Sequence, residues 1–166
     1  MAQQVTIVIN EIDVLLRFRQ ATFKQGEAME QPKAEKFVST LKADNERGSD
    51  VGLMHDSYFH WLLESINQVR EYMVNPPVFG KDDTTINLLM PGNWEHYAPN
   101  APGLKYAMIE LISNGLLADW YDNIKQDLSR AFKQKVEVNK AEIHSIIYSL
   151  KAPTVTVTSA SGSFQN

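Results

Sequence analysis

The side chains best suited to chemistry are four histidines and a few carboxylates, with His55, His60 and Glu64 grouped in one stretch. His60 and Glu64 are four residues apart, so on a helix they would share one face and could both reach a metal ion. His55 and His60 are five apart and would lie on different faces. A catalytic zinc ion needs three protein ligands, and this stretch supplies two. We therefore expect no metal site here, and keep a metal or ligand site at His60 and Glu64 as the alternative.

A further carboxylate, Glu110, lies inside a strongly apolar stretch. A buried carboxylate must find a partner or stay protonated. We interpret Glu110 as the partner of an arginine or lysine from a neighbouring helix. A general acid or base at this position is the alternative, and it would join His60 and Glu64 in a ligand-binding or catalytic helical bundle.

Other catalytic signatures do not occur in the sequence. The eight glycines are scattered and form neither a phosphate-binding loop nor a G-x-S-x-G nucleophile turn. The chain has no cysteine, which excludes disulfides, thiolate metal sites and cysteine catalysis. We therefore predict no catalytic, cofactor-binding or metal-binding residues, no cofactor and no enzymatic activity.

The element that must organise the fold is the stretch Gly103–Asp122, GLKYAMIELISNGLLADWYD. Apolar side chains occur nearly all around its helical wheel, which predicts a helix surrounded by other elements rather than one with a single buried face. Glu110 and Asp119 within it, and its polar flanks, argue against a membrane span. The predicted core residues of this helix are Leu111, Leu116, Trp120 and Tyr121.

Composition indicates one folded domain with no strong charge preference for a partner. The chain has 166 residues, 43% of them hydrophobic and 22% charged, and a formal net charge of −4. A protein without a basic surplus is not expected to bind nucleic acid as its main partner. No basic segment followed by an apolar run marks the N-terminus for export, so we expect folding in the cytosol.

The remaining pattern predicts a mainly α fold: a bundle of about four helices with a small β element and an extended C-terminal arm. Residues 1–151 would form the helical domain, with residues 26–52 as an inserted loop. Strand Val5–Ile9 would pair with strand Thr84–Met90, and the other helices would begin at Asn10, at Asp56 or Ser57, and near Ile124. They would end at Gly26, near Val74 and near Lys151. The first helix would use Ile12, Leu15, Leu16, Phe18 and Phe23 as its apolar face, with Arg17 and Arg19 in solvent.

The C-terminal stretch 152–166, APTVTVTSASGSFQN, contains no charged residue. Thr and Val alternate over 154–158, a strand pattern, and three large apolar residues cannot offset the entropy lost when fifteen residues become ordered. We expect this arm to add a strand to a sheet edge on another copy or another protein. The predicted contact residues are Val155, Thr156, Val157 and Phe164.

Three segments resemble a known family: LLADWYDNIKQD at 116–127, SLKAPT at 149–154, and the extended end that follows. This order resembles the head-to-tail adaptor, or connector, proteins of tailed bacteriophages. In those small helical proteins a core helix ends in a Trp-Tyr pair and a later segment leads to a C-terminal arm. The opening INEIDVLLRFRQAT, at 9–22, is similar to structural proteins of phages of gut Bacteroidales.

The resemblance implies a virion structural protein that forms a homo-oligomeric, dodecameric ring in the neck between portal and tail. Its partners would be the portal protein and other neck or tail proteins, DNA would only pass through the ring, and no membrane would be involved. It would be made and assembled in the host cytoplasm. Another neck or tail-completion role is one alternative, and a helical-bundle ligand- or metal-binding protein is the alternative from a different class.

Overall fold

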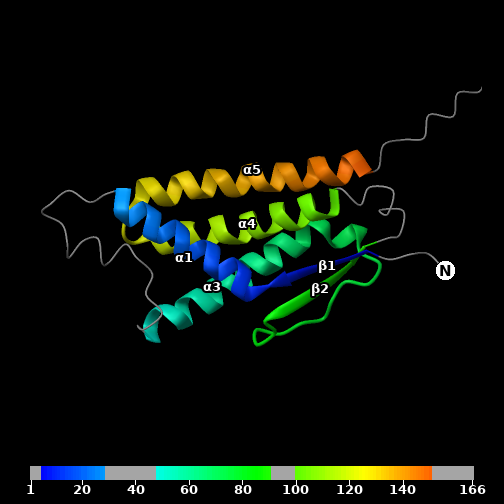
Figure 1. Ribbon diagram of the computed structural model, residues 1–166, viewed down its shortest axis with the longest axis horizontal. Helices are drawn as coiled ribbons and strands as arrows, with labels where there is room; N and C mark the ends of the chain where they lie inside the picture. The colour runs from blue at the N-terminus through cyan, green and yellow to red at the C-terminus, as the bar shows by residue number, and fades with distance from the viewer. Residues whose placement is uncertain (1–4, 29–47, 91–99, 151–166) are drawn as a thin grey trace, which may run out of the picture.

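The computed structural model describes residues 5–28, 48–90 and 100–150 (Figure 1). Within these ranges the chain is mainly helical and carries one small two-stranded sheet, so the predicted fold class is confirmed. In chain order the elements are β1 (Val5–Asn10), α1 (Glu11–Ala28), α3 (Gly48–Val69), the 3-10 turn η1 (Arg70–Tyr72), β2 (Thr85–Met90), α4 (Asn100–Asp122) and α5 (Gln126–Leu150).

Helix α4 lies in the middle of the bundle, as its sequence predicts. It packs against α1, α3, α5 and β1 (Figure 1). Every residue from Leu111 to Ala118 is buried, and so is Tyr121. Trp120 is only partly buried, which corrects its assignment to the core. Near the end of α4 its ring packs edge-on against Phe18 of α1, with ring centres 6.0 Å apart, and so covers the margin of the core.

The predicted pairing of the two strands is also confirmed. β1 and β2 run antiparallel, with Val5 opposite Met90 and Asn10 opposite Thr85. Alternate side chains of both strands point into the core, as expected for a sheet with one covered face. They are Ile7, Ile9, Ile86, Leu88 and Met90.

The buried face of α1 differs from the prediction. Val14, Phe18 and Thr22 point inward at four-residue spacing. The predicted apolar face was wrong for three of its residues, because Ile12, Leu16 and Phe23 are 76%, 53% and 42% exposed. Arg17 is not free in solvent either, since it forms an ion pair with Glu110. The helix also passes through Gly26 to Ala28, because one glycine lowers helix stability by only about 1 kcal/mol.

Helix α3 starts at Gly48, earlier than the predicted cap at Asp56 or Ser57, and it ends at Val69. Both proposed caps bond elsewhere: Asp56 pairs with Lys81, and the Ser57 hydroxyl donates to Asp119 of α4. The predicted loop 26–52 therefore contains the ends of two helices, and residues 29–47 lie outside the described residues. The C-terminal arm 152–166 lies outside them as well.

Candidate functional site

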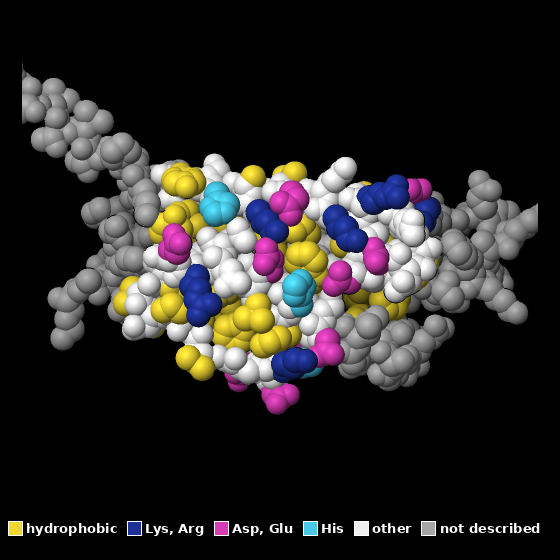
Figure 2. Space-filling model, turned by 180° about the vertical axis from the view of Figure 1, so that it is seen from behind, with side chains coloured by type: hydrophobic (Ala, Val, Ile, Leu, Met, Phe, Trp, Pro, Cys, Tyr) yellow, Lys and Arg dark blue, Asp and Glu magenta, His cyan; other side chains and the backbone are white. Residues whose placement is uncertain are grey.

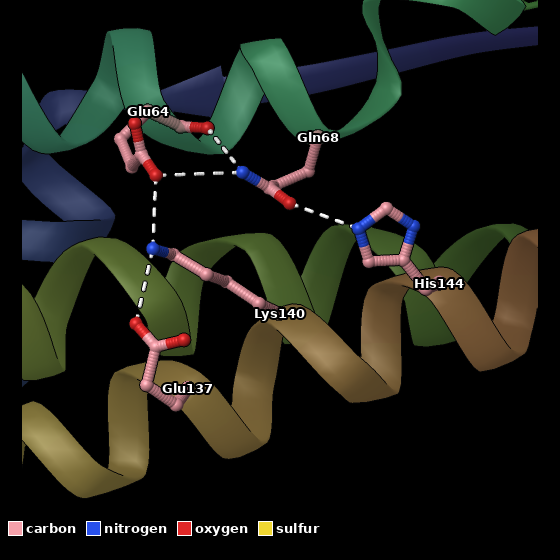
Figure 3. Close-up of polar contacts among 5 residues, drawn as sticks. All are labelled: Glu64, Gln68, Glu137, Lys140 and His144. Carbon is pink, nitrogen blue, oxygen red and sulfur yellow. Dashed lines mark hydrogen bonds and ion pairs between the residues drawn. The ribbon is translucent and has the colours of Figure 1, made fainter.

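Among the described residues, five linked polar side chains join α3 to α5, and we call this set the α3–α5 polar seam (Figure 3). Lys140 Nζ lies 2.9 Å from Glu64 Oε1 and 3.1 Å from Glu137 Oε1. Gln68 donates its amide to the Glu64 side chain at 3.5 Å. Its amide oxygen lies 3.0 Å from Nε2 of His144, so that nitrogen carries the proton.

The chemistry of the seam is that of a structural contact. The hydrogen bond that Lys140 donates to the Glu64 carboxylate raises the pKa of Lys140, and the contact with Glu137 acts in the same direction. The two carboxylates favour the protonated form of Lys140, whereas a nucleophilic or basic lysine needs its neutral form. The seam therefore fixes α5 on α3, and we assign it no catalytic role.

The two residues of the alternative site, His60 and Glu64, have different neighbours. His60 is exposed, with its ring against the edge of Trp61 at 5.1 Å between ring centres, whereas Glu64 belongs to the seam. In the part of the chain that the structure describes, no three His, Asp or Glu side chains gather as metal ligands do.

Glu110 has the partner expected from its sequence context. Arg17 of α1 forms an ion pair with it, and the guanidinium lies 4.4 Å from the centre of the Tyr106 ring. Both charged side chains are about one-third exposed, at 34% for Arg17 and 30% for Glu110. The pair ties α1 to α4 at the rim of the bundle, which confirms the structural interpretation of Glu110.

Asp119 anchors a cluster that sequence reasoning missed. Its Oδ2 accepts hydrogen bonds from Ser57 Oγ at 2.5 Å and from Trp61 Nε1 at 2.8 Å. The Trp61 ring lies over Gly115, one turn before Asp119 on α4. The sequence does contain a signal for this cluster, a glycine followed four residues later by an aspartate. The glycine leaves room for a large ring, and the aspartate accepts a hydrogen bond from the N–H group of that ring.

The most unusual surface feature is an exposed apolar line on α1, which we call the α1 stripe and define as Ile12, Leu16 and Phe23. With Arg19 between them, its positions follow steps of four, three and four residues, the spacing of a helix–helix contact. Beside it lies an open groove of about 630 Å³, lined by Leu16, Arg19, Gln20, Phe23 and Lys24.

A second apolar surface, the α3 patch, consists of Phe59, Leu63, Val78 and Phe79. Phe59 and Phe79 pack edge to face with ring centres 5.9 Å apart, and Leu63 and Val78 are exposed. Phe59 and Leu63 come from α3, whereas Val78 and Phe79 come from the segment between η1 and β2.

We compared the chain with protein-family models, curated proteins and solved structures, and none of them matches it. Within residues 5–28, 48–90 and 100–150, no helix combines the length and apolar character needed to cross a bilayer. The predicted contact residues Val155, Thr156, Val157 and Phe164 lie outside the described residues.

Charge is mixed over the face shown in Figure 2. Acidic and basic side chains are interspersed there, with hydrophobic side chains between them, rather than gathered by sign. A surface that binds the phosphate backbone of nucleic acid concentrates lysine and arginine. This face therefore lacks the character of a nucleic-acid interface.

Proposed function

We propose that this protein is an assembly subunit: a virion structural protein of the head-to-tail adaptor type, which forms a homo-oligomeric ring in the phage neck. The observation that carries the proposal is that α1 has two apolar faces. Val14 and Phe18 fill the core, whereas Ile12 and Leu16 are 76% and 53% exposed, and Phe23 is 42% exposed at the end of the same line. An exposed apolar line at helix-packing spacing is typical of a surface that another helix covers.

The occupant that fits this surface is a second copy of the chain. A ring needs two different surfaces that complement each other, whereas a two-fold dimer needs one surface that complements itself. The α1 stripe and the α3 patch supply two such surfaces, one on α1 and one formed by α3 with the segment that follows η1. In the proposed ring, the stripe of one copy packs on the α3 patch of the next. The position of the ring between portal and tail rests on the resemblance of residues 116–127 and 149–154.

Substituting Leu16 by aspartate should abolish association without unfolding the subunit, because it places a charge in the proposed contact. Sedimentation should show the parent protein as a multiple of 18.8 kDa and Leu16→Asp as a single copy. Far-UV circular dichroism should be the same for both. Ser145→Asp adds the same charge at an exposed position of α5 outside both surfaces, and should leave association intact. A parent protein that stays monomeric would contradict the proposal.

Disulfide cross-linking tests which surfaces meet in the assembly. The chain has no cysteine, so only the introduced cysteines can react. Leu16→Cys mixed with Leu63→Cys should form disulfide-linked pairs under mild oxidation, and neither variant alone should do so. Cross-linking by Leu16→Cys alone would indicate a two-fold dimer and count against a ring. Electron micrographs of the parent protein should show closed rings.

The arm 152–166 is assigned to the same assembly. Among the described residues, β1 pairs only with β2, so no further strand occupies its other edge there. An alternating Thr-Val strand from a neighbouring copy could pair at such an edge through main-chain hydrogen bonds. Deleting residues 152–166 should give a protein with unchanged helicity that no longer assembles. If the shortened protein unfolds, the arm belongs to the core of the subunit. If the shortened protein assembles normally, the arm has no part in assembly.

A further inference from the structure

A second groove, separate from the α3–α5 polar seam, lies where α1 meets α4 and α5. Its volume is about 500 Å³. The side chains that decide its chemistry are Gln20 and Lys24 from α1, Ser113 and Asn114 from α4, and Phe132 and Lys135 from α5. Three helices thus contribute polar groups to one hollow.

The charges around this groove are not balanced. Arg17 and Glu110 also line it, but they form an ion pair and neutralise each other. Lys24 and Lys135 form no ion pair with any carboxylate among the described residues. Lys135 Nζ instead lies 4.7 Å from the centre of the Phe132 ring, held by a cation–π contact. Within the described part of the chain, two lysines without an ion-pair partner therefore border the same hollow.

The inner wall of the groove contains hydrogen-bonding groups with unused capacity. Ser113 is 4% exposed, and its hydroxyl has no hydrogen-bond partner within the described part of the chain. The hydroxyl oxygen is almost fully shielded, as are the unpaired hydroxyls of Tyr58, Ser65 and Tyr121, but Ser113 alone among these four lines the groove, and its hydroxyl reaches an anion there by turning about the Cα–Cβ bond. Asn114 donates Nδ2 to Asn139 Oδ1 at 2.8 Å, which uses one of its two N–H groups. The groove thus has hydrogen-bond donors on its inner wall and ammonium groups at its border. An oxyanion accepts hydrogen bonds from both kinds of group.

We propose that this groove binds an oxyanion, a carboxylate or a phosphate, between the ammonium groups of Lys24 and Lys135, with the Ser113 hydroxyl donating to it. The oxyanion belongs either to a free small molecule or to an acidic side chain of a neighbouring copy. Gln20 and Lys24 line both this groove and the one beside the α1 stripe, so a copy docked on the stripe would reach it. Binding of an acidic side chain from a neighbouring copy rests on the proposed function, whereas binding of a free small molecule does not.

Titration calorimetry on the full chain tests the site, with citrate and inorganic phosphate as probes at constant ionic strength. The parent should bind at least one probe, and the double variant Lys24→Gln/Lys135→Gln should bind it at least about tenfold more weakly, since each lost charged hydrogen bond is worth that much or more. Arg70→Gln/Lys105→Gln makes the same charge change outside the groove and should bind as the parent does. Ser113→Ala should weaken binding without lowering the thermal midpoint.

Absence of binding to the parent would overturn the proposal, as would equal losses in the two double variants. Unchanged affinity in Ser113→Ala would remove that hydroxyl from the site. Sedimentation in the presence of the bound probe separates the sources: dissociation of the oligomer identifies a neighbour's carboxylate, and an unchanged oligomer identifies a free anion. If the chain proves monomeric, the proposed ring fails while the calorimetry still tests the groove.

Discussion

Replacing Leu116 by alanine is expected to lower the free energy of unfolding by about 2–5 kcal/mol, as truncations of buried leucines do. Leu116 is 2% exposed and lies in the fully buried stretch of α4 that contacts the rest of the bundle. The substitution removes buried apolar atoms and leaves a cavity that rigid helices on several sides can only partly fill. Urea denaturation, followed by circular dichroism, measures the loss.

The matched control is Leu16→Ala on the α1 stripe. It removes the same atoms from a side chain that is 53% exposed, so the free energy of unfolding of the isolated subunit should change by no more than about 0.5 kcal/mol. Association should weaken in Leu16→Ala and not in Leu116→Ala under conditions where both are folded. A loss below about 1 kcal/mol for Leu116→Ala would contradict the central position of α4.

The contrast between these two leucines also explains which parts of the fold the sequence predicts. α4 is apolar on every side, so only a central position can bury it, and its limits of 103–122 were close to Asn100–Asp122. The strands β1 and β2 were equally predictable, because two short β-branched or apolar runs must pair with each other. α5 follows a single apolar line and was placed within two residues, at Gln126–Leu150.

α1 could not be oriented in this way. It carries two apolar lines, one through Val14 and Phe18 and one through Ile12 and Leu16, and the periodicity does not say which faces the core. The choice follows from contacts between distant segments, such as the ion pair of Arg17 with Glu110. The second apolar line of this helix is the sequence feature on which the proposed intermolecular contact rests.

The polar contacts also divide into those that the sequence predicts and those that depend on contacts between distant segments. The type of partner for Glu110 was predictable, because a carboxylate in apolar surroundings needs a cation. The identity of Arg17 was not, since it is 93 residues away. Ser57 was mistaken for a helix cap because a hydroxyl before an apolar run has that local meaning, whereas its actual acceptor, Asp119, comes from another helix.

Gly115→Ala should destabilise the subunit by about 3 kcal/mol, although alanine is the better helix former by about 1 kcal/mol. A Cβ built on Gly115 would lie 2.5 Å from Cγ and Cε2 of Trp61 and closer still to Cδ2. The ring cannot move aside freely, because Trp61 Nε1 donates to Asp119 at 2.8 Å. Displacing it combines an overpacking penalty of about 1–3 kcal/mol with the loss of a hydrogen bond to a charged group, about 1.5–3 kcal/mol.

Gly103→Ala is the control within the same helix. No atom of the described residues lies within 4 Å of a Cβ built on Gly103, so only the gain in helix propensity remains, and stability should rise by up to about 1 kcal/mol. Opposite signs for the two substitutions in urea denaturation would show that the contact with Trp61, rather than backbone conformation, requires glycine at 115. Trp61 fluorescence should also change only in Gly115→Ala. If both substitutions stabilise the protein, the close packing of α3 on α4 through Trp61 and Asp119 is wrong.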